Sequence, residues 1–117
     1  MDSGELLRRL ALNDEEVVRT AMTAGGSHRR ATGTLDARTA CLVRLAALLA
    51  VGAPAVACRP TAEAAQAIGA STDELVDVLL TLGPVIGAGA LVAAAPRLAL
   101  AIDVEIEDLD TAWHEDA

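Results

Sequence analysis

The sequence predicts an all-α protein, a small bundle of five or six helices. Alanine and leucine, which favour helices, supply much of the apolar content, and apolar residues make up 53% of the chain. Aromatic residues, which are typical of strands, are limited to Trp113. No alternation of apolar and polar residues is long enough to indicate a strand. We therefore expect a core of alanine, leucine and valine.

The length of 117 residues suits a single domain. We expect N-terminal helices and a loop over 1–34, a helical core over 35–102 and an acidic tail over 103–117. A domain of this size buries a modest core, and its apolar helices offer more surface than it can cover alone. This excess predicts a homo-oligomer.

The charge of the chain excludes a nucleic-acid-binding function. The formal net charge is −8, and the nine basic residues are all arginine. Phosphate binding needs a basic face, and the isolated pair Arg29-Arg30 is interpreted as part of a solvated loop. Two cysteines make no disulfide framework, and Asp2 and Glu5 occupy the place of a signal peptide's basic region. We expect a cytoplasmic protein.

Two helices are expected before residue 35. The first runs from about Gly4 to Leu12. The second has Asn13 as its N-cap, because Glu16 follows three residues later as in a capping box. The glycines and small polar residues of "GGSHRRATGT" then predict a loop.

The stretch "LDARTACLVRLAALLAVG" from Leu35 predicts a helix that is apolar over most of its circumference. Such a helix is expected at the centre of the bundle. Gly52 suits its C-terminal end, and another helix begins near Pro54 or later and ends at Gly69. Because Pro60 has no N–H to donate, this helix either starts at Pro60 or bends there.

The clearest capping box in the chain is "STDE" at 71–74, which opens a leucine-rich helix. We expect the Gly-Pro pair at 83–84 to end it and a further helix to run from about Pro84, bent or broken at Pro96. The charge-free residues 78–96 are just long enough to span a bilayer. The interruption and the small side chains favour close helix packing instead, so no membrane segment is expected.

The remaining features indicate neither a metal site nor a cofactor. His28 and His114, the two histidines, fall in the expected loop and in the tail, so no zinc or di-iron ligand set can be assembled. The segment "GPVIGAG" lacks the lysine of a phosphate-binding loop. The acidic tail is interpreted as a solvated end, or as a helix that docks through Ile106, Leu109 and Trp113.

The order of these elements resembles the carboxymuconolactone decarboxylase family, which includes the AhpD-like alkyl hydroperoxidases. The resemblance covers about residues 35–102 and is carried by "LDARTACLVRLAALLAVGA", "GASTDELVDVL" and "PVIGAGALVAAAP". It implies a small all-α protein that assembles as a homotrimer or homohexamer. It also implies where reactive groups would lie. Cys41 matches the family's glutamate, Thr61 matches its histidine, and Ala57 and Pro54 match its cysteines, so none of these reactive groups is retained.

Cys58 is the remaining candidate for a catalytic group. Arg59 and a nearby helix start would favour its thiolate, whereas a buried cysteine behaves as a small apolar residue. Thr61 can hydrogen-bond a ligand or begin a helix, but it cannot shuttle a proton at neutral pH. Cys41 is expected in the core, or paired with Cys58 in a reversible disulfide across the turn at 52–54.

Three arginines are candidates for binding a carboxylate ligand, namely Arg44, Arg59 and Arg97. Arg44 and Arg97, which lie in apolar helices, are alternatively expected to reach the surface or to pair with acids.

Three functional hypotheses follow. The first is a non-catalytic oligomer that has a structural role or holds a small apolar or carboxylated molecule between its helices. The second is an enzyme rebuilt around Cys58 and Arg59, or around His28, which reduces peroxides or decarboxylates a lactone. The third is an unrelated helical or membrane-associated protein.

Overall fold

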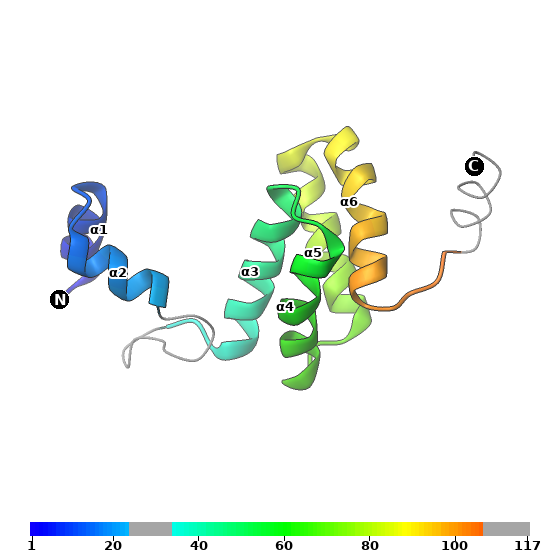
Figure 1. Cartoon of the computed structure of the whole chain (residues 1–117), viewed down its shortest axis with the longest axis horizontal. Coiled ribbons are helices and arrows are strands. Elements are labelled where there is room, and N and C mark those ends of the chain that lie inside the picture. The colour runs from blue at the N-terminus through cyan, green and yellow to red at the C-terminus, as the bar shows by residue number, and fades with distance from the viewer. Residues whose placement is uncertain (24–33, 107–117) are drawn as a thin grey trace. The chain divides into compact units, whose positions relative to one another are not determined.

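The computed structural model describes residues 1–23 and 34–106, and every regular element in them is a helix (Figure 1). The six helices are α1 (Ser3–Ala11), α2 (Glu15–Thr23), α3 (Ala37–Ala50), α4 (Ala55–Ala67), α5 (Thr72–Ile86) and α6 (Ala88–Ala101). The predicted all-α class and the number of helices are therefore confirmed for this part of the chain. The chain divides into two compact units, Met1–Leu35 and Asp36–Ala117, which are described separately.

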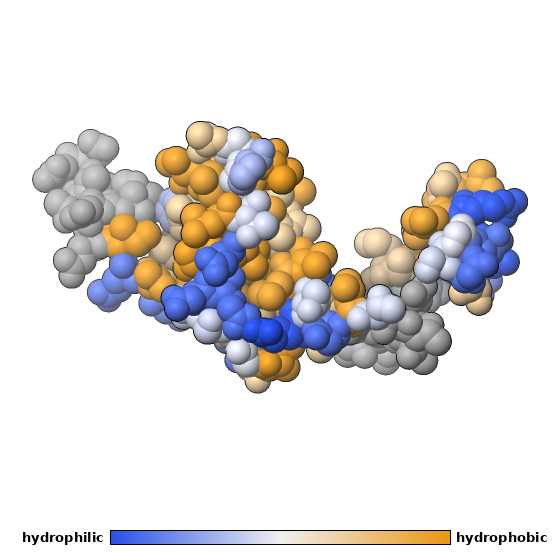
Figure 2. All heavy atoms as spheres, turned by 180° about the vertical axis from the view of Figure 1, so that it is seen from behind, coloured by the Kyte–Doolittle hydropathy of each residue, from blue (hydrophilic) through white to orange (hydrophobic). Residues whose placement is uncertain are grey.

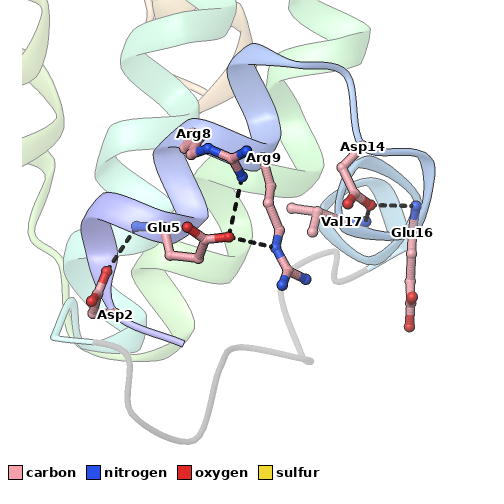
Figure 3. Close-up of polar contacts among 7 residues, drawn as sticks. All are labelled: Asp2, Glu5, Arg8, Arg9, Asp14, Glu16 and Val17. Carbon is pink, nitrogen blue, oxygen red and sulfur yellow. Dashed lines mark hydrogen bonds and ion pairs between the residues drawn. The ribbon is translucent and has the colours of Figure 1, made fainter.

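The first unit contains the two short helices α1 and α2. The Asp2 carboxylate caps α1 by accepting a hydrogen bond of 2.7 Å from the backbone N–H of Glu5. The Glu5 carboxylate in turn pairs with Arg8 and Arg9, one turn further along the helix (Figure 3). These pairs are largely open to solvent, so each contributes little to stability.

The predicted N-cap of α2 was wrong, because Asp14 rather than Asn13 caps this helix. One carboxylate oxygen of Asp14 accepts hydrogen bonds from the backbone N–H groups of Glu16 and Val17, at 3.1 and 3.2 Å (Figure 3). Asn13 instead adopts a left-handed conformation, with φ of 58°, at the end of α1. Asparagine tolerates this conformation better than most residues. Asn13 therefore ends α1, and its neighbour Asp14 starts α2.

The second unit is a four-helix bundle in which α3 packs against α4, α5 and α6, and α6 also packs against α4 and α5. The central position predicted for α3 is thus confirmed. Its apolar circumference is not entirely covered, however. Leu45 and Leu49 are buried, whereas Val43, Ala47 and Ala50 are exposed.

The core of the second unit consists of small alanines around a few leucines. The largest fully buried side chains among the described residues are those of Leu45, Leu49, Leu75 and Cys58. The alanines that pack with them are Ala62, Ala65, Ala70, Ala94 and Ala101. No valine is buried among the described residues, so the expectation of a core containing valine was wrong. The short alanine side chains allow helices to approach closely, and most of the described valines are exposed instead.

Capping residues fix most helix ends of the second unit. The predicted capping box is confirmed, since Ser71 and Glu74 each accept a hydrogen bond from the other's backbone N–H. Asp36 caps α3 through a 2.7 Å bond from the N–H of Thr39, a cap that the sequence reading missed. Gly52 and Gly69 end α3 and α4 with φ of 83° and 103°, as predicted.

Three prolines lie inside helices, whereas Pro84 was expected to start a helix and Pro60 either to start one or to bend it. Pro60 lies within α4, Pro84 within α5 and Pro96 within α6. Each removes a hydrogen bond from the carbonyl of the residue four positions earlier. These earlier residues are all on the exposed side of their helices, namely Val56, Leu80 and Val92. The deprived carbonyls therefore face the side of each helix on which solvent can reach them.

The break between α5 and α6 lies at Gly87 and not at the predicted 83–84. Gly87 has φ of 90° and ψ of 159°, a conformation that is essentially restricted to glycine. The break divides the charge-free stretch into two short helical pieces. No helix in residues 1–23 or 34–106 is long and apolar enough to cross a membrane.

Replacing Gly87 should separate this backbone requirement from ordinary helix propensity. We expect Gly87→Ala to lower the free energy of unfolding by about 1–3 kcal/mol, because alanine must adopt a strained conformation. Gly89→Ala is the matched control, since an added Cβ there meets no atom within 4 Å. It should be neutral or stabilising by up to about 1 kcal/mol. Urea unfolding followed by circular dichroism measures both, and equal effects would contradict the assignment of the break.

Candidate functional site

The candidate site lies where the turn after α3 leads into α4. Cys58 stands in the first turn of α4, and its backbone N–H donates to the carbonyl of Pro54 at 3.1 Å. The side chain points into the core and is fully buried. Its thiol lies 3.8 Å from the carbonyl oxygen of Ala53, close enough for a weak S–H···O hydrogen bond. The site is thus a buried thiol beside a turn carbonyl.

Arg97 reaches the same carbonyl from α6. Its Nη1 donates to the Ala53 oxygen at 2.5 Å, and its Nη2 donates to the Leu49 oxygen at 3.4 Å. The Leu49 carbonyl belongs to the last turn of α3, where backbone acceptors lack partners within the helix and the helix dipole is negative. Arg97 therefore caps the C-terminal end of α3 and ties α6 to the turn. Its guanidinium is engaged with backbone carbonyls, which leaves less of it for a carboxylate ligand.

The thiol of Cys58 is not activated by this environment. Burial raises its pKa above the ordinary value, and the charge of Arg97 lowers it by a smaller amount. A reactive cysteine needs the opposite balance, because the thiolate is the nucleophile. At neutral pH the group is therefore a protonated thiol that packs with the apolar core.

Arg59, the predicted partner of Cys58, points elsewhere. Its Nη1 lies 3.0 and 3.1 Å from the two carboxylate oxygens of Asp103, and its Nη2 donates to the carbonyl of Leu100. Consecutive residues on a helix do not face each other. Arg59 thus caps the end of α6, just as Arg97 caps the end of α3. The sequence did not indicate that Asp103 pairs with Arg59. It also did not indicate that the two arginines bind backbone carbonyls at the ends of α6 and α3.

The other predicted site residues are only partly brought together. Thr61 lies half-buried one turn after Cys58 on α4, whereas Ala57 and Pro54 are exposed. Cys41 is half-buried and packs against the core from α3. Arg44, also on α3, is half-buried.

The two cysteines are free thiols. Because α3 and α4 are joined by a short turn, the distance of each cysteine from the turn gives their offset along the hairpin. Cys41 lies about 14 Å from the end of α3, and Cys58 about 5 Å from the start of α4, so they are offset by about 9 Å. A disulfide usually needs its Cα atoms within about 7 Å. This offset argues against the pairing.

An ion pair that the sequence did not indicate joins the starts of α3 and α5. Arg38, in the first turn of α3, pairs with Glu74, the capping-box residue of α5. Glu74 therefore has two functions, capping its own helix and holding a neighbouring one. This ion pair lies at the start of α3, at the opposite end of that helix from the turn beside the thiol.

Several predicted features lie outside the described residues. They are His28, the pair Arg29-Arg30, and the tail residues Leu109, Trp113 and His114. Within the residues that are described, no group of three or more histidine, cysteine or acidic side chains could hold a metal ion.

The chain was also compared with known proteins. No protein-family model, curated protein or solved structure matches it. The resemblance to the carboxymuconolactone decarboxylase family therefore stays a prediction from the residues.

The contribution of Arg97 can be measured by Arg97→Met, which keeps much of the side-chain length but removes the donors. We expect the free energy of unfolding to fall by about 1.5–3 kcal/mol, as for hydrogen bonds that involve a charged group. Arg59→Met is the matched control. Its contacts are exposed to solvent, so its effect should stay below about 1 kcal/mol. Urea unfolding of both variants checks this order, and a larger loss for Arg59→Met would contradict it.

The buried thiol should also make stability depend on alkaline pH. Because the chain has neither tyrosine nor lysine, cysteines are the side chains that titrate between about pH 8.5 and 10.5. The pKa of Cys58 is raised in the folded state, so the unfolded chain loses this proton first as the pH rises. The stabilisation is fully present below the ordinary thiol pKa and is lost above it.

We therefore expect the free energy of unfolding to decline from about pH 8.5 upward, by at most about 1.4 kcal/mol per pH unit. Cys58→Ala should remove this decline, whereas Cys41→Ala should keep it. Urea unfolding at a series of pH values between 7 and 10 measures the slopes. A decline that is unchanged in Cys58→Ala would show that another group causes it.

Proposed function

We propose that this chain is a non-catalytic protein of the carboxymuconolactone decarboxylase/AhpD-like type that acts as a self-assembling structural bundle. The order of helices and caps from residue 35 to 102 supports the family. The residues at the positions of its reactive groups, Cys41 and Thr61 among them, support the lack of catalysis. The assembly we propose is a homotrimer or homohexamer.

The observation that carries this proposal is the exposure of valine on all four helices of the second unit or beside them. The most exposed are Val51, Val56, Val85 and Val92, at 80%, 77%, 82% and 72% of their surface. Single exposed apolar residues are common on monomers, but contiguous patches mark interaction sites. A core without valine and a surface with many of them fit a bundle whose outer faces meet other copies.

One such patch surrounds the connection between α5 and α6, and we call it the α5–α6 tip. It comprises the exposed residues Pro84, Val85, Ala88, Gly89 and Val92. This end of the second unit is at the top of Figures 1 and 2, and its surface is largely apolar in Figure 2. Residues 78–96 contain no charged side chain. An interface formed by the tip would therefore not have to remove a charged group of the tip from water, which is costly.

The geometry gives less support to a carboxylate ligand. The guanidinium groups of Arg59 and Arg97 already contact Asp103 and backbone carbonyls. A ligand would have to displace these contacts, which also cap helix ends. Assembly through apolar surfaces requires no such displacement.

The enzyme alternative depends on a thiolate at Cys58. A fully buried sulfur with a raised pKa is poorly suited to attack a peroxide or a lactone. Fast alkylation of the native protein near neutral pH, abolished by Cys58→Ser, would therefore overturn the non-catalytic part of the proposal. A Cys58 thiol that reacts only on unfolding is the expected result.

Self-assembly is tested by light scattering combined with size-exclusion chromatography. We expect the wild-type protein to have the mass of three or six copies, and Val85→Glu to lower that mass because it places a charge in an apolar contact. Gln66→Glu is the matched control, since it adds the same charge at an exposed position on α4. A monomeric wild-type protein, or an equal loss in both variants, would contradict the proposal.

A further inference from the structure

The net charge of the chain is concentrated in its C-terminal tail. Residues 1–35 contain five acidic and five basic residues, so their formal net charge is zero. Residues 36–102 contain five acidic and four basic residues and carry a net charge of −1. The tail, residues 103–117, contains seven acidic residues and no basic one. It therefore accounts for −7 of the formal net charge of −8.

The tail begins at a fixed place on the bundle. Asp103, its first residue, pairs with Arg59 of α4, and the backbone N–H of Val104 donates to the carbonyl of Ala99 at 2.9 Å. The tail thus leaves from the end of α6, the lower end of this helix in Figure 1, whereas the α5–α6 tip is at the top. Ion pairs within one copy leave its net charge unchanged, so each copy brings a formal charge of −8 into an assembly.

The distance from the tip to the tail decides whether the tails of two copies can interact. The helix α6 joins the two, and its 14 residues give a length of about 21 Å at the usual rise per residue. When two copies meet through their tips, the starts of their tails therefore lie on the order of 40 Å apart or closer. The Debye length is about 30 Å at 10 mM salt and below about 10 Å at 0.5 M. The tails consequently repel one another at low salt and are screened at high salt.

The contact between copies responds differently, because the α5–α6 tip is apolar and residues 78–96 contain no charged side chain. Screening removes no attraction between charged groups from such a contact. A net charge far from zero, by contrast, opposes association through repulsion between copies. Salt therefore acts on the repulsion between tails and leaves the attraction between tips in place.

We infer that the acidic tail makes self-assembly depend on ionic strength, so that copies stay apart at low salt and assemble as salt is added. This inference rests on the proposed function, since it requires copies that meet through their apolar outer faces. Its sign is specific. An assembly held by ion pairs between copies would be weakened by salt, whereas one opposed by its tails is strengthened.

Sedimentation equilibrium of the full-length protein at 10 mM and 0.5 M sodium chloride, at neutral pH, measures this dependence. The quantity compared is the protein concentration at which half of the copies are assembled. We expect it to be at least about tenfold lower at 0.5 M salt, because several like charges on each tail interact over about one Debye length at 10 mM.

A neutral-tail variant shows whether the tail causes the response. In the full-length chain the six acidic residues after Asp103 are replaced by their amides, and Asp103 is kept because it pairs with Arg59. The substitutions are Glu105→Gln, Glu107→Gln, Asp108→Asn, Asp110→Asn, Glu115→Gln and Asp116→Asn. This variant should assemble at 10 mM salt about as readily as the wild-type protein does at 0.5 M.

The matched control keeps the charge and changes the order. Residues 104–117 are shuffled in the full-length chain, which preserves their composition and all six acidic residues. Repulsion between tails depends on their charge, so this variant should respond to salt as the wild-type protein does.

The outcomes separate this inference from the proposed function. An assembly that salt leaves unchanged or weakens would overturn the regulation and leave self-assembly standing. A response that persists in the neutral-tail variant, or that is lost in the shuffled one, would also overturn the regulation alone. Wild-type and neutral-tail proteins that both stay monomeric at 0.5 M salt would overturn self-assembly itself.

Discussion

The hydrogen bonds from Arg97 to the carbonyls of Leu49 and Ala53 are the constraint on which the second unit depends. They join α6 to the end of α3 and to the turn into α4, so one guanidinium holds three helices at one point. Arg59 completes the arrangement in the opposite direction, from α4 to the end of α6. Each arginine supplies donors where helix carbonyls and the negative end of the dipole need them. The core between these contacts can then consist of small side chains.

Small side chains in the core and branched ones outside are two aspects of the same packing. Alanines such as Ala62 and Ala65 let α4 lie close to α3 and α6, and little room remains for a β-branched residue between them. The prolines follow the same division, since each removes a hydrogen bond from the exposed side of its helix. The outer surface therefore carries both the carbonyls that the prolines leave without a helical partner and the exposed valines. The self-assembly proposed above would cover these carbonyls and valines and shield them from water.

Much of the fold could be predicted from local sequence, because caps and helical periodicity act over a few residues. The Ser71 capping box and the ends at Gly52 and Gly69 are examples. The errors occurred where two local signals competed. Asn13 and Asp14 are both good caps, and the left-handed residue needed after α1 decided between them. Gly83-Pro84 is a typical helix end, but the backbone conformation of Gly87 fixes the break four residues later.

The site was harder to predict because its decisive partner is distant in sequence. Arg59 follows Cys58 directly, yet neighbours on a helix point in different directions, and the arginine near the thiol is Arg97 on α6. No local pattern reports which helix ends meet in the bundle. The geometry also explains why a cation near the thiol does not activate it. Arg97 is hydrogen-bonded to the same carbonyl as the thiol, and the sulfur is fully buried, where ionisation is most costly. Arg97 stabilises the end of α3, and Cys58 packs in the apolar core as a protonated thiol.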